Sequence, residues 1–391
     1  MDSMLTAIEK QLDPFPLYEV MRQSHPVYFD PRRHSWNVFC YDDVQRVLSD
    51  YETFSSQFRG NRRPDAQNSF AASIISTDPP RHRQLRSLAT QAFTPRAVEA
   101  LAPRITAIVQ EHLDRVDGTG GMEVIGDLAY PLPVIVIAEL LGIPSQDRER
   151  FKRWSDFAVA SANDMDEVDV GRFQGTEMME MGMYFMNMIA QRRETPGEDL
   201  ISGLLEASID GEHLSQIELL GFCVLLLVAG NETTTNLLGN AMLTFGEHPE
   251  QWEELRANPE LIPQAIEEVL RYRSPVQSMF RFSRAEAVFQ GKKLPANSHV
   301  IAWIGSANHD GSLFPQPETF DIMRTPNKHI AFGHGIHYCL GAPLARLEAK
   351  IALGAMLERY PAFKLAPGAS LKRQPSLIVY GLHEVPIKFT P

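Results

Sequence analysis

One segment of about thirty residues, 215–247, constrains the fold more than any other part of the sequence, because its first half is apolar on every side. As a single helix it would be roughly 50 Å long, enough to cross the middle of a large protein. Pro249 predicts its end, since a proline disfavours the helical conformation in the residue before it. The longest uninterrupted apolar run, 219–230, is shorter than the ~20 residues that cross a bilayer. The segment therefore predicts a buried core helix and no membrane span.

Helical periodicity continues along most of the chain, so we expect a mainly α fold. A stretch at 279–302 with β-type residues and turn signals predicts a small β-rich subdomain. Two short strands are expected within 26–39, and the last helix near Cys339. The other expected helices are 41–48, 81–92, 95–115, 134–141, 146–160, 177–192, 249–257 and 262–271. No linker or repeat interrupts the sequence, so residues 1–391 are expected to form a single domain.

The charge balance excludes two classes of partner. The chain has 37 Lys and Arg against 49 Asp and Glu, a net charge of −12, whereas nucleic acids and anionic membranes require a broadly basic surface. The three cysteines are too few and too scattered for a disulfide framework, which favours a reducing compartment. No signal peptide is expected at the N-terminus. We therefore expect a cytoplasmic protein, and a monomer.

A glycine-rich loop, 332–341, reads Phe-Gly-His-Gly-Ile-His-Tyr-Cys-Leu-Gly and is followed by a helix start. Cys339 is thus expected at a helix N-terminus, where the dipole and unpaired backbone N–H groups stabilise a thiolate and lower the pKa of the cysteine. The glycines allow the backbone to close tightly around whatever the sulfur binds. The pattern indicates a ligand environment.

Three interpretations of this loop are possible. A buried structural cysteine in a tight turn leaves the three glycines unexplained. A zinc site would draw on His329, His334, His337 and Cys339, but zinc ligands usually come as repeated pairs, and no second cysteine lies near. The third interpretation is an iron thiolate.

The loop resembles the haem-binding loop of the cytochrome P450 superfamily, F-x-x-G-x-H-x-C-x-G, at every fixed position, including Gly335 and Gly341. Gly333 stands at a variable position of this motif and is expected to line the cofactor with them. The resemblance implies the large cytochrome P450 fold, haem b as cofactor and O₂ as co-substrate. It makes Cys339 the proximal iron ligand, whose thiolate favours O–O cleavage. It also implies that His337 bonds a haem propionate and that Phe332 packs beside the sulfur.

An acid and an arginine three residues apart, Glu268 and Arg271, face each other on one predicted helix. Alone, such a pair is usually solvated and contributes little stability. In order and spacing, however, it resembles the family's E-x-x-R pair, with Arg324 as the third partner. The resemblance implies a structural triad that locks the region carrying the cysteine loop.

Cations at three positions resemble the family's propionate ligands. His82 and Arg86 lie four residues apart in 78–86, which resembles the element D-P-P-x-H-x-x-x-R. Arg281 occupies the place of a further propionate arginine. Two or three cations for two carboxylates would match the charges. The alternative for His82 and Arg86 is an ordinary polar helix face.

The sequence 229–233 resembles the family's A-G-x-D/E-T element on the long central helix. By resemblance, Ala229 and Gly230 would lie over the oxygen-binding face of haem, with the glycine making room for O₂ and water. Thr233 would hydrogen-bond the bound oxygen, and Glu232 would connect that site to a proton source. Asn231, at the variable position of the element, is given no role.

The resemblance implies a soluble, bacterial-type monooxygenase that inserts one oxygen atom into a hydrophobic substrate by hydroxylation or epoxidation. Polyketides, terpenoids, steroids and fatty acids all fit. Electrons would come from a ferredoxin or flavodoxin with its NAD(P)H-dependent reductase, docking on a basic patch of Arg81, Arg83 and Arg346. By analogy the substrate is recognised by the loop 55–75, the methionine-rich stretch 178–186 and Leu225, Val228, Val276, Met279, Phe280 and Ile378. A methionine stripe is as consistent with a packed core as with a pocket.

Two alternatives keep the haem and change the function. A peroxide-driven peroxygenase would be expected to lack the acid and alcohol pair, so Glu232 and Thr233 argue against it. A non-catalytic haem sensor would need no oxygen-activating threonine.

Overall fold

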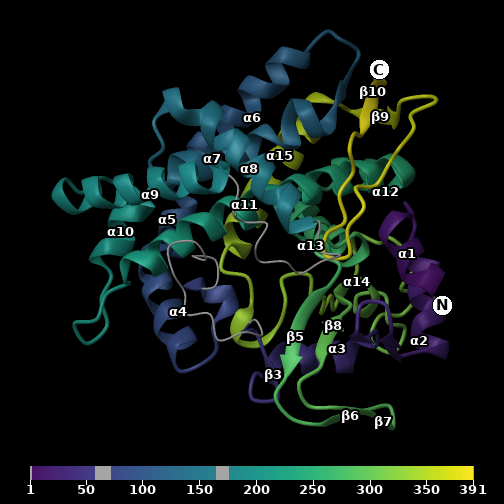
Figure 1. Ribbon diagram of the computed structural model, residues 1–391. Coiled ribbons are helices and arrows are strands. Elements are labelled where there is room, and N and C mark those ends of the chain that lie inside the picture. The colour runs from purple at the N-terminus through teal and green to yellow at the C-terminus, as the bar shows by residue number, and fades with distance from the viewer. Residues whose placement is uncertain (1, 58–71, 164–175, 391) are drawn as a thin grey trace. The chain divides into compact units, whose positions relative to one another are not determined.

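The computed structural model describes residues 2–57, 72–163 and 176–390 (Figure 1). The chain falls into two compact units. The first unit comprises Met1–Ser55, Ala102–Leu132 and Thr233–Pro391, and the second comprises Ser56–Leu101 and Pro133–Glu232. The single-domain organisation of residues 1–391 stays a prediction. Helices predominate in both, which confirms the predicted mainly α class.

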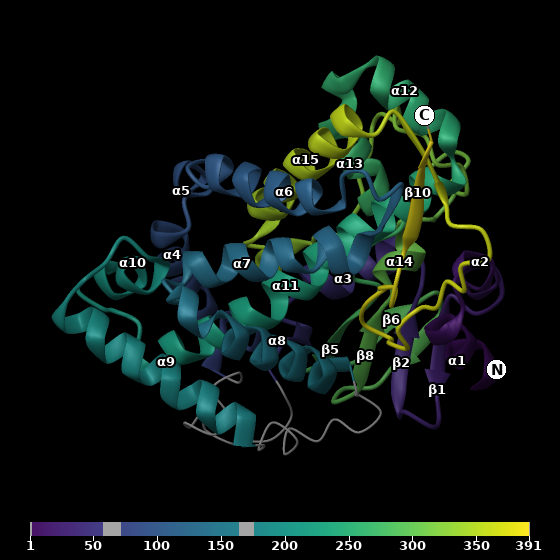
Figure 2. The same cartoon turned by 90° about the horizontal axis from the view of Figure 1, so that it is seen from above.

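The first unit carries the small sheets. Its helices are α1 (Asp2–Lys10), α2 (Phe15–Ser24), α3 (Tyr41–Ser49), α6 (Ala102–Val116), α12 (Pro249–Ala257), α13 (Ile262–Tyr272), α14 (Ile304–Ala307) and α15 (Ala342–Arg359). Its strands are β1 (Val27–Asp30), β2 (Ser35–Val38), β3 (Phe54–Ser55), β4 (Gly121–Glu123), β5 (Met279–Ser283), β6 (Ala287–Phe289), β7 (Lys292–Leu294), β8 (His299–Ala302), β9 (Ala362–Leu365) and β10 (Pro386–Thr390). Helix α15 packs along α6 and α13 (Figure 2).

Five of these strands form a mixed sheet in the order β1-β2-β8-β5-β3. Strand β2 pairs parallel with β8, so that Ser35 lies opposite His299, and the other pairs are antiparallel. A second sheet has the order β4-β10-β9, and β6 and β7 form a hairpin.

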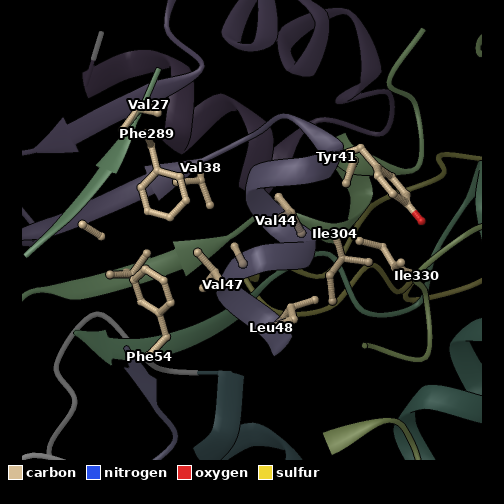
Figure 3. Packing of buried hydrophobic residues seen from close by; sticks show 14 of the residues in the cluster. Val27, Val38, Tyr41, Val44, Val47, Leu48, Phe54, Phe289, Ile304 and Ile330 are labelled. Carbon is tan, nitrogen blue, oxygen red and sulfur yellow. The ribbon is translucent and has the colours of Figure 1, made fainter. Parts of the chain in front are cut away.

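Helix α3 packs its apolar side on the mixed sheet. Val44, Val47 and Leu48, spaced three and four residues apart, point toward the strands and share one buried cluster with Phe54 and Phe289 (Figure 3). Complete burial of such side chains contributes about 1.5 to 3 kcal/mol each. The cluster fixes α3, whose C-terminal end lies against the cysteine loop.

The second unit is helical among its described residues. It contains α4 (Arg81–Ala92), α5 (Pro95–Glu99), α8 (Arg148–Asn163), α9 (Thr176–Glu194) and α10 (Leu200–Glu206), together with nearly all of α7 (Pro131–Leu140). Helix α8 packs against α9, and α10 packs against α4 and α9.

The long helix α11 (Gln216–Glu247) agrees with the predicted segment to within one residue, and its chain passes from the second unit into the first. By length and composition it is apolar enough to cross a membrane, but half of its most apolar stretch is buried inside the protein. That burial is characteristic of a core helix.

The predicted helix 95–115 was wrong as a single element. The structure ends α5 at Glu99 and starts α6 at Ala102. The reason is Pro103, which would lie in the interior of one continuous helix but fits the first turn of a new one. Helices α1, α2, α10 and α14 were not predicted.

Candidate functional site

The loop that carries Cys339 closes on itself through its backbone. The Cys339 N–H donates to the carbonyl oxygen of Phe332 at 2.9 Å, and the Gly333 N–H donates to that of Ile330 at 2.8 Å. Cys339 is half-buried and forms no disulfide. The loop therefore holds a sulfur that is in no disulfide at a fixed place in the chain.

Two glycines of the loop adopt a left-handed backbone that other residues rarely take. Gly333 has φ +76° and Gly335 has φ +71°. A Cβ atom on Gly335 would lie 2.8 Å from Cα of Ser49, at the end of α3, so the loop approaches this helix closely because the side chain is missing.

Helix α15 begins three residues after Cys339, at Ala342, so the predicted position within the helix N-terminus is corrected. The sulfur still lies near that end, since a Cβ on the N-cap residue Gly341 would lie 3.9 Å from the Cys339 Sγ. The first turn of α15 carries a proline at one of its first two positions, as the sequence predicts.

A salt bridge joins the helix after the loop to α13. Arg346 donates from Nε and Nη2 to the two carboxylate oxygens of Glu267 at 2.7 and 2.8 Å, and its guanidinium lies 4.4 Å from the centre of the Phe332 ring. His329 Nε2 lies 3.0 Å from the same carboxylate. Burial raises the pKa of Glu267, but hydrogen bonds from Arg346 and His329 outweigh it and lower that pKa to about 2. This carboxylate is therefore ionised at neutral pH.

The structure brings Glu268, Arg271 and Arg324 together. Glu268 and Arg271 are 0% exposed, with two hydrogen bonds of 2.8 Å between them, and Arg324 Nε donates to Glu268 at 3.1 Å. Arg271 also donates to the carbonyl oxygens of Asn308, Pro317 and Thr319. The pair is thus a buried cross-link between α13 and the chain that leads to the cysteine loop.

The remaining predicted cofactor residues are divided between the units. In the first unit, His337 and Phe332 are half-buried in the loop, and Arg281 is buried on β5, where it donates to the carbonyl oxygen of Phe280. In the second unit, α4 carries His82, which is buried, and Arg86, which is half-buried. That the two sets meet on one haem stays a prediction.

All six predicted pocket residues are half-buried, and two of them, Val276 and Met279, pack against the buried cluster between α3 and the mixed sheet. Within the first unit, Val276 forms a β-bridge with Val379. The backbone N–H groups of Gln277 and Ser278 both donate to the carbonyl oxygen of Ile378. These contacts place Val276, Met279 and Phe280 beside the chain at Ile378. Leu225 and Val228 lie on the half of α11 that belongs to the second unit. Most of the predicted loop 55–75, namely 58–71, lies outside the described residues.

The open side of α11, where the sequence predicts the oxygen site, is more exposed than the rest of that turn among the residues that the structure describes. Ala229 is exposed, and Leu225, Val228, Glu232 and Thr233 are half-buried, whereas the neighbouring positions on the other sides of the helix are mostly buried. Spacings of three and four residues put these five on one side. The open side combines apolar residues with an acid and an alcohol.

Gly230 has a packing role that the sequence does not reveal. A Cβ atom here would lie 2.7 Å from Cδ1 of Ile137 on α7, so the glycine allows the two helices of the second unit to approach closely. The predicted role, room for O₂ and water, is untested.

Two further residues near this segment were missed by the sequence analysis. Asn231 is buried and donates from Nδ2 to Oγ of Ser155 on α8 at 2.7 Å. Glu348 on α15 is buried and hydrogen-bonded to Thr234, and burial raises its pKa to about 8. Neither stands out in the sequence, because its partner lies far away along the chain.

The methionine-rich stretch of α9 is divided between core and surface. Met181 and Met188 are buried, whereas Met179 and Met183 are 66% and 62% exposed. The zinc alternative finds no support, because the described residues contain no group of three His, Cys, Asp or Glu able to hold a metal ion.

Comparison with known proteins identifies relatives of this arrangement over nearly the whole chain. A family model described as Cytochrome P450 matches residues 174–391. The putative cytochrome P450 YjiB of Bacillus subtilis is 45% identical, over 96% of this chain and 93% of its own. The cytochrome P450 monooxygenase PikC of Streptomyces venezuelae is 40% identical, over 96% and 91%. The crystal structure of CYP109E1 from Bacillus megaterium in complex with testosterone has a TM-score of 0.86 at 43% identity, covering 97% of this chain and 100% of that one.

Proposed function

The chain belongs to the cytochrome P450 family, and from that premise we propose that it oxidises a hydrophobic small molecule and that Cys339 would hold the haem iron. It is a P450 monooxygenase, and the cofactor of its family is haem. When bound, haem b supplies O₂ activation, so that one oxygen atom enters the substrate and the other becomes water with two electrons and two protons.

The observation that carries the proposal is the half-buried Cys339, which is in no disulfide, in its closed backbone loop. A thiolate ligand needs an accessible sulfur held near positive charge, and the sulfur lies beside the N-cap of α15. Burial raises the pKa of Cys40 to about 11 and that of Cys223 to about 12, so these two cysteines are protonated thiols at neutral pH. The donor chemistry of the loop fits haem iron.

His337, Arg281, His82 and Arg86 are proposed to bind the two propionates. Arg281 is a buried cation on β5 of the first unit. An ionised carboxylate gives such a cation a strong, charge-assisted hydrogen bond. Phe332, held from one side by Arg346, is proposed to pack beside the sulfur.

Glu232 and Thr233 are proposed to supply the proton and hold the oxygen. They share the open side of α11 with Ala229, Leu225 and Val228. Loss of this pair would divert electrons to hydrogen peroxide, since oxygen reduced without timely proton delivery leaves before substrate reacts.

The substrate is proposed to be an apolar molecule of roughly steroid size, hydroxylated or epoxidised. Half-buried apolar side chains favour this class, because an apolar ligand completes their burial. A relative that is 43% identical binds testosterone. Terpenoid, polyketide and fatty-acid substrates have the same chemistry and remain within the proposal.

Electrons are proposed to come from a ferredoxin or flavodoxin with an NAD(P)H-dependent reductase, in the cytoplasm. The basic patch expected from the sequence is weaker than it looked. Arg81 forms a bidentate salt bridge with Glu218, and Arg346 forms one with Glu267. Docking would therefore rely less on these two arginines than their charges suggest.

The ferrous carbon monoxide difference spectrum tests the proposal directly. Wild type and Cys40→Ala, a matched change at another half-buried cysteine, should give the thiolate-type band, and Cys339→Ala should lose it. A histidine-type band in wild type would overturn the assignment. Turnover of testosterone faster with peroxide alone than with reductase would favour the peroxygenase, and no O₂ consumption with any substrate would favour the sensor.

A further inference from the structure

The segment 230–235 of α11 is intrinsically a poor helix. It consists of a glycine, an asparagine, a glutamate and three threonines, and every one except the glutamate disfavours a helix interior relative to alanine. The helix is nevertheless continuous through it. Contacts with other helices must therefore hold this turn in place.

In the second unit, one of these contacts is a single buried hydrogen bond. Asn231 and Ser155 are each 1% exposed, and the Nδ2 of Asn231 lies 2.7 Å from the Oγ of Ser155 on α8. A buried amide costs free energy unless it is hydrogen-bonded, and an apolar residue would bury itself here without that requirement. The bond therefore fixes one register between α11 and α8, rather than adding general stability.

Helix α8 is itself anchored to α9 beside this point. Trp154, next to Ser155, lies 5.1 Å from the Tyr184 ring, and the Arg150 guanidinium lies 5.2 Å from Trp154 and 5.4 Å from Tyr184. Arg150 also donates to Glu180 at 2.6 Å, and Tyr184 donates to Asp147 at 2.8 Å. Ser155 therefore lies on a helix whose position is fixed by these contacts with α9.

We propose that Asn231 is a positioning residue for the reaction: its hydrogen bond to Ser155 holds the weak turn of α11 so that Glu232, the next residue, keeps one orientation. The inference rests on the proposed function, since Glu232 acts as a proton carrier only there. Coupled turnover consumes substrate, O₂, two electrons and two protons, and gives the oxygenated product and water. A misplaced Glu232 delivers protons late, and O₂ with two electrons and two protons leaves as hydrogen peroxide.

The test compares peroxide released per NADPH consumed, in haem-loaded protein with a plant-type ferredoxin, its reductase and testosterone as probe substrate. Asn231→Leu and Ser155→Ala should each raise the peroxide fraction by about three- to tenfold, the factor associated with one neutral buried hydrogen bond. The spectral Kd for testosterone should change less than twofold. Ser155→Thr, which keeps the hydroxyl, is the matched control and should stay near wild type.

The double variant Asn231→Leu/Ser155→Ala decides whether the two residues act as one. If they do, its peroxide fraction equals that of either single variant, because the same bond is already lost. The proposal would be overturned if the peroxide fraction of the double variant rose by the product of the two single increases. It would also be overturned if neither single variant changed the peroxide fraction, or if Ser155→Thr raised it as much as Ser155→Ala does.

Hydrogen exchange gives a readout that does not depend on turnover. Amides in 229–235 should exchange about three- to tenfold faster in Asn231→Leu and Ser155→Ala, while those of α15 are unchanged. Unchanged exchange in 229–235 would refute the positioning role. The two proposals can fail separately. Absence of the thiolate-type carbonyl band in wild type would refute the proposed function, whereas the exchange rates of 229–235 would still test whether Asn231 holds this turn.

Discussion

Glu348 makes a pH-dependent contribution to stability that a single substitution should expose. Its side chain is 1% exposed on α15, and among the described residues Oε1 has no hydrogen-bond partner. Burial raises its pKa from 4.5 to about 8, and the bond to Thr234 offsets that rise only in part. Between these two pKa values the folded protein keeps a proton that the unfolded chain releases.

The sign of the effect follows from proton linkage. Where the folded state binds more protons, the free energy of unfolding falls as pH rises, so stability from this group is complete below pH 4.5 and lost as pH rises through about 8. Each pH unit inside that window costs about 1.4 kcal/mol. From pH 5.5 to pH 7 wild type should therefore lose about 2 kcal/mol through Glu348 alone.

Glu348→Gln removes the titration and keeps the shape. The difference in the free energy of unfolding between Glu348→Gln and wild type should rise by about 2 kcal/mol from pH 5.5 to pH 7. The new amide changes this difference only by a constant amount, which does not depend on pH. Urea unfolding of haem-loaded protein, followed by tryptophan fluorescence at constant ionic strength, measures this difference. Glu358→Gln, an exposed position on the same helix, is the control and should show a constant difference. A flat difference for Glu348→Gln would refute the buried, protonated carboxyl.

Two further predictions concern the support of the cysteine loop, and urea unfolding midpoints check both. Arg271→Met should lower the free energy of unfolding by about 3 to 5 kcal/mol, because it leaves Glu268 buried without its main partner. The control Arg115→Met, in an exposed pair with Glu111, should lower it by less than about 1 kcal/mol. Equal losses in the two variants would contradict the buried cross-link. Gly335→Ala should lower the free energy of unfolding by about 3 kcal/mol, because the new Cβ adds left-handed backbone strain and overlaps Ser49. At Gly368, which has φ +76° and open space around it, the same change should lower it by about 1 kcal/mol, from the strain alone. Similar losses at the two glycines would show that the approach to α3 is not tight.

Local sequence signals predicted what depends on neighbours in the chain. The apolar run and Pro249 located α11, and the spacing of three residues identified Glu268 and Arg271 as partners. The sequence could not reveal that this pair is fully buried, since the other partners of Arg271 are carbonyl oxygens 37 to 48 residues away. Asn231 was dismissed for the same reason: its partner, Ser155, is 76 residues distant.

Two consecutive carboxylates of α13 explain why the cysteine loop is held at both ends. Glu268 binds Arg324 and Asn327, which precede the loop, and Glu267 binds Arg346, which follows it on α15. Adjacent residues on a helix point about 100° apart, so one turn of α13 reaches both sides without strain. The low pKa of Glu267 keeps its salt bridge charged across the neutral range. The position of Cys339 is therefore set from α13 through pairs of opposite charge, and a change at either carboxylate should move the sulfur even though neither touches it.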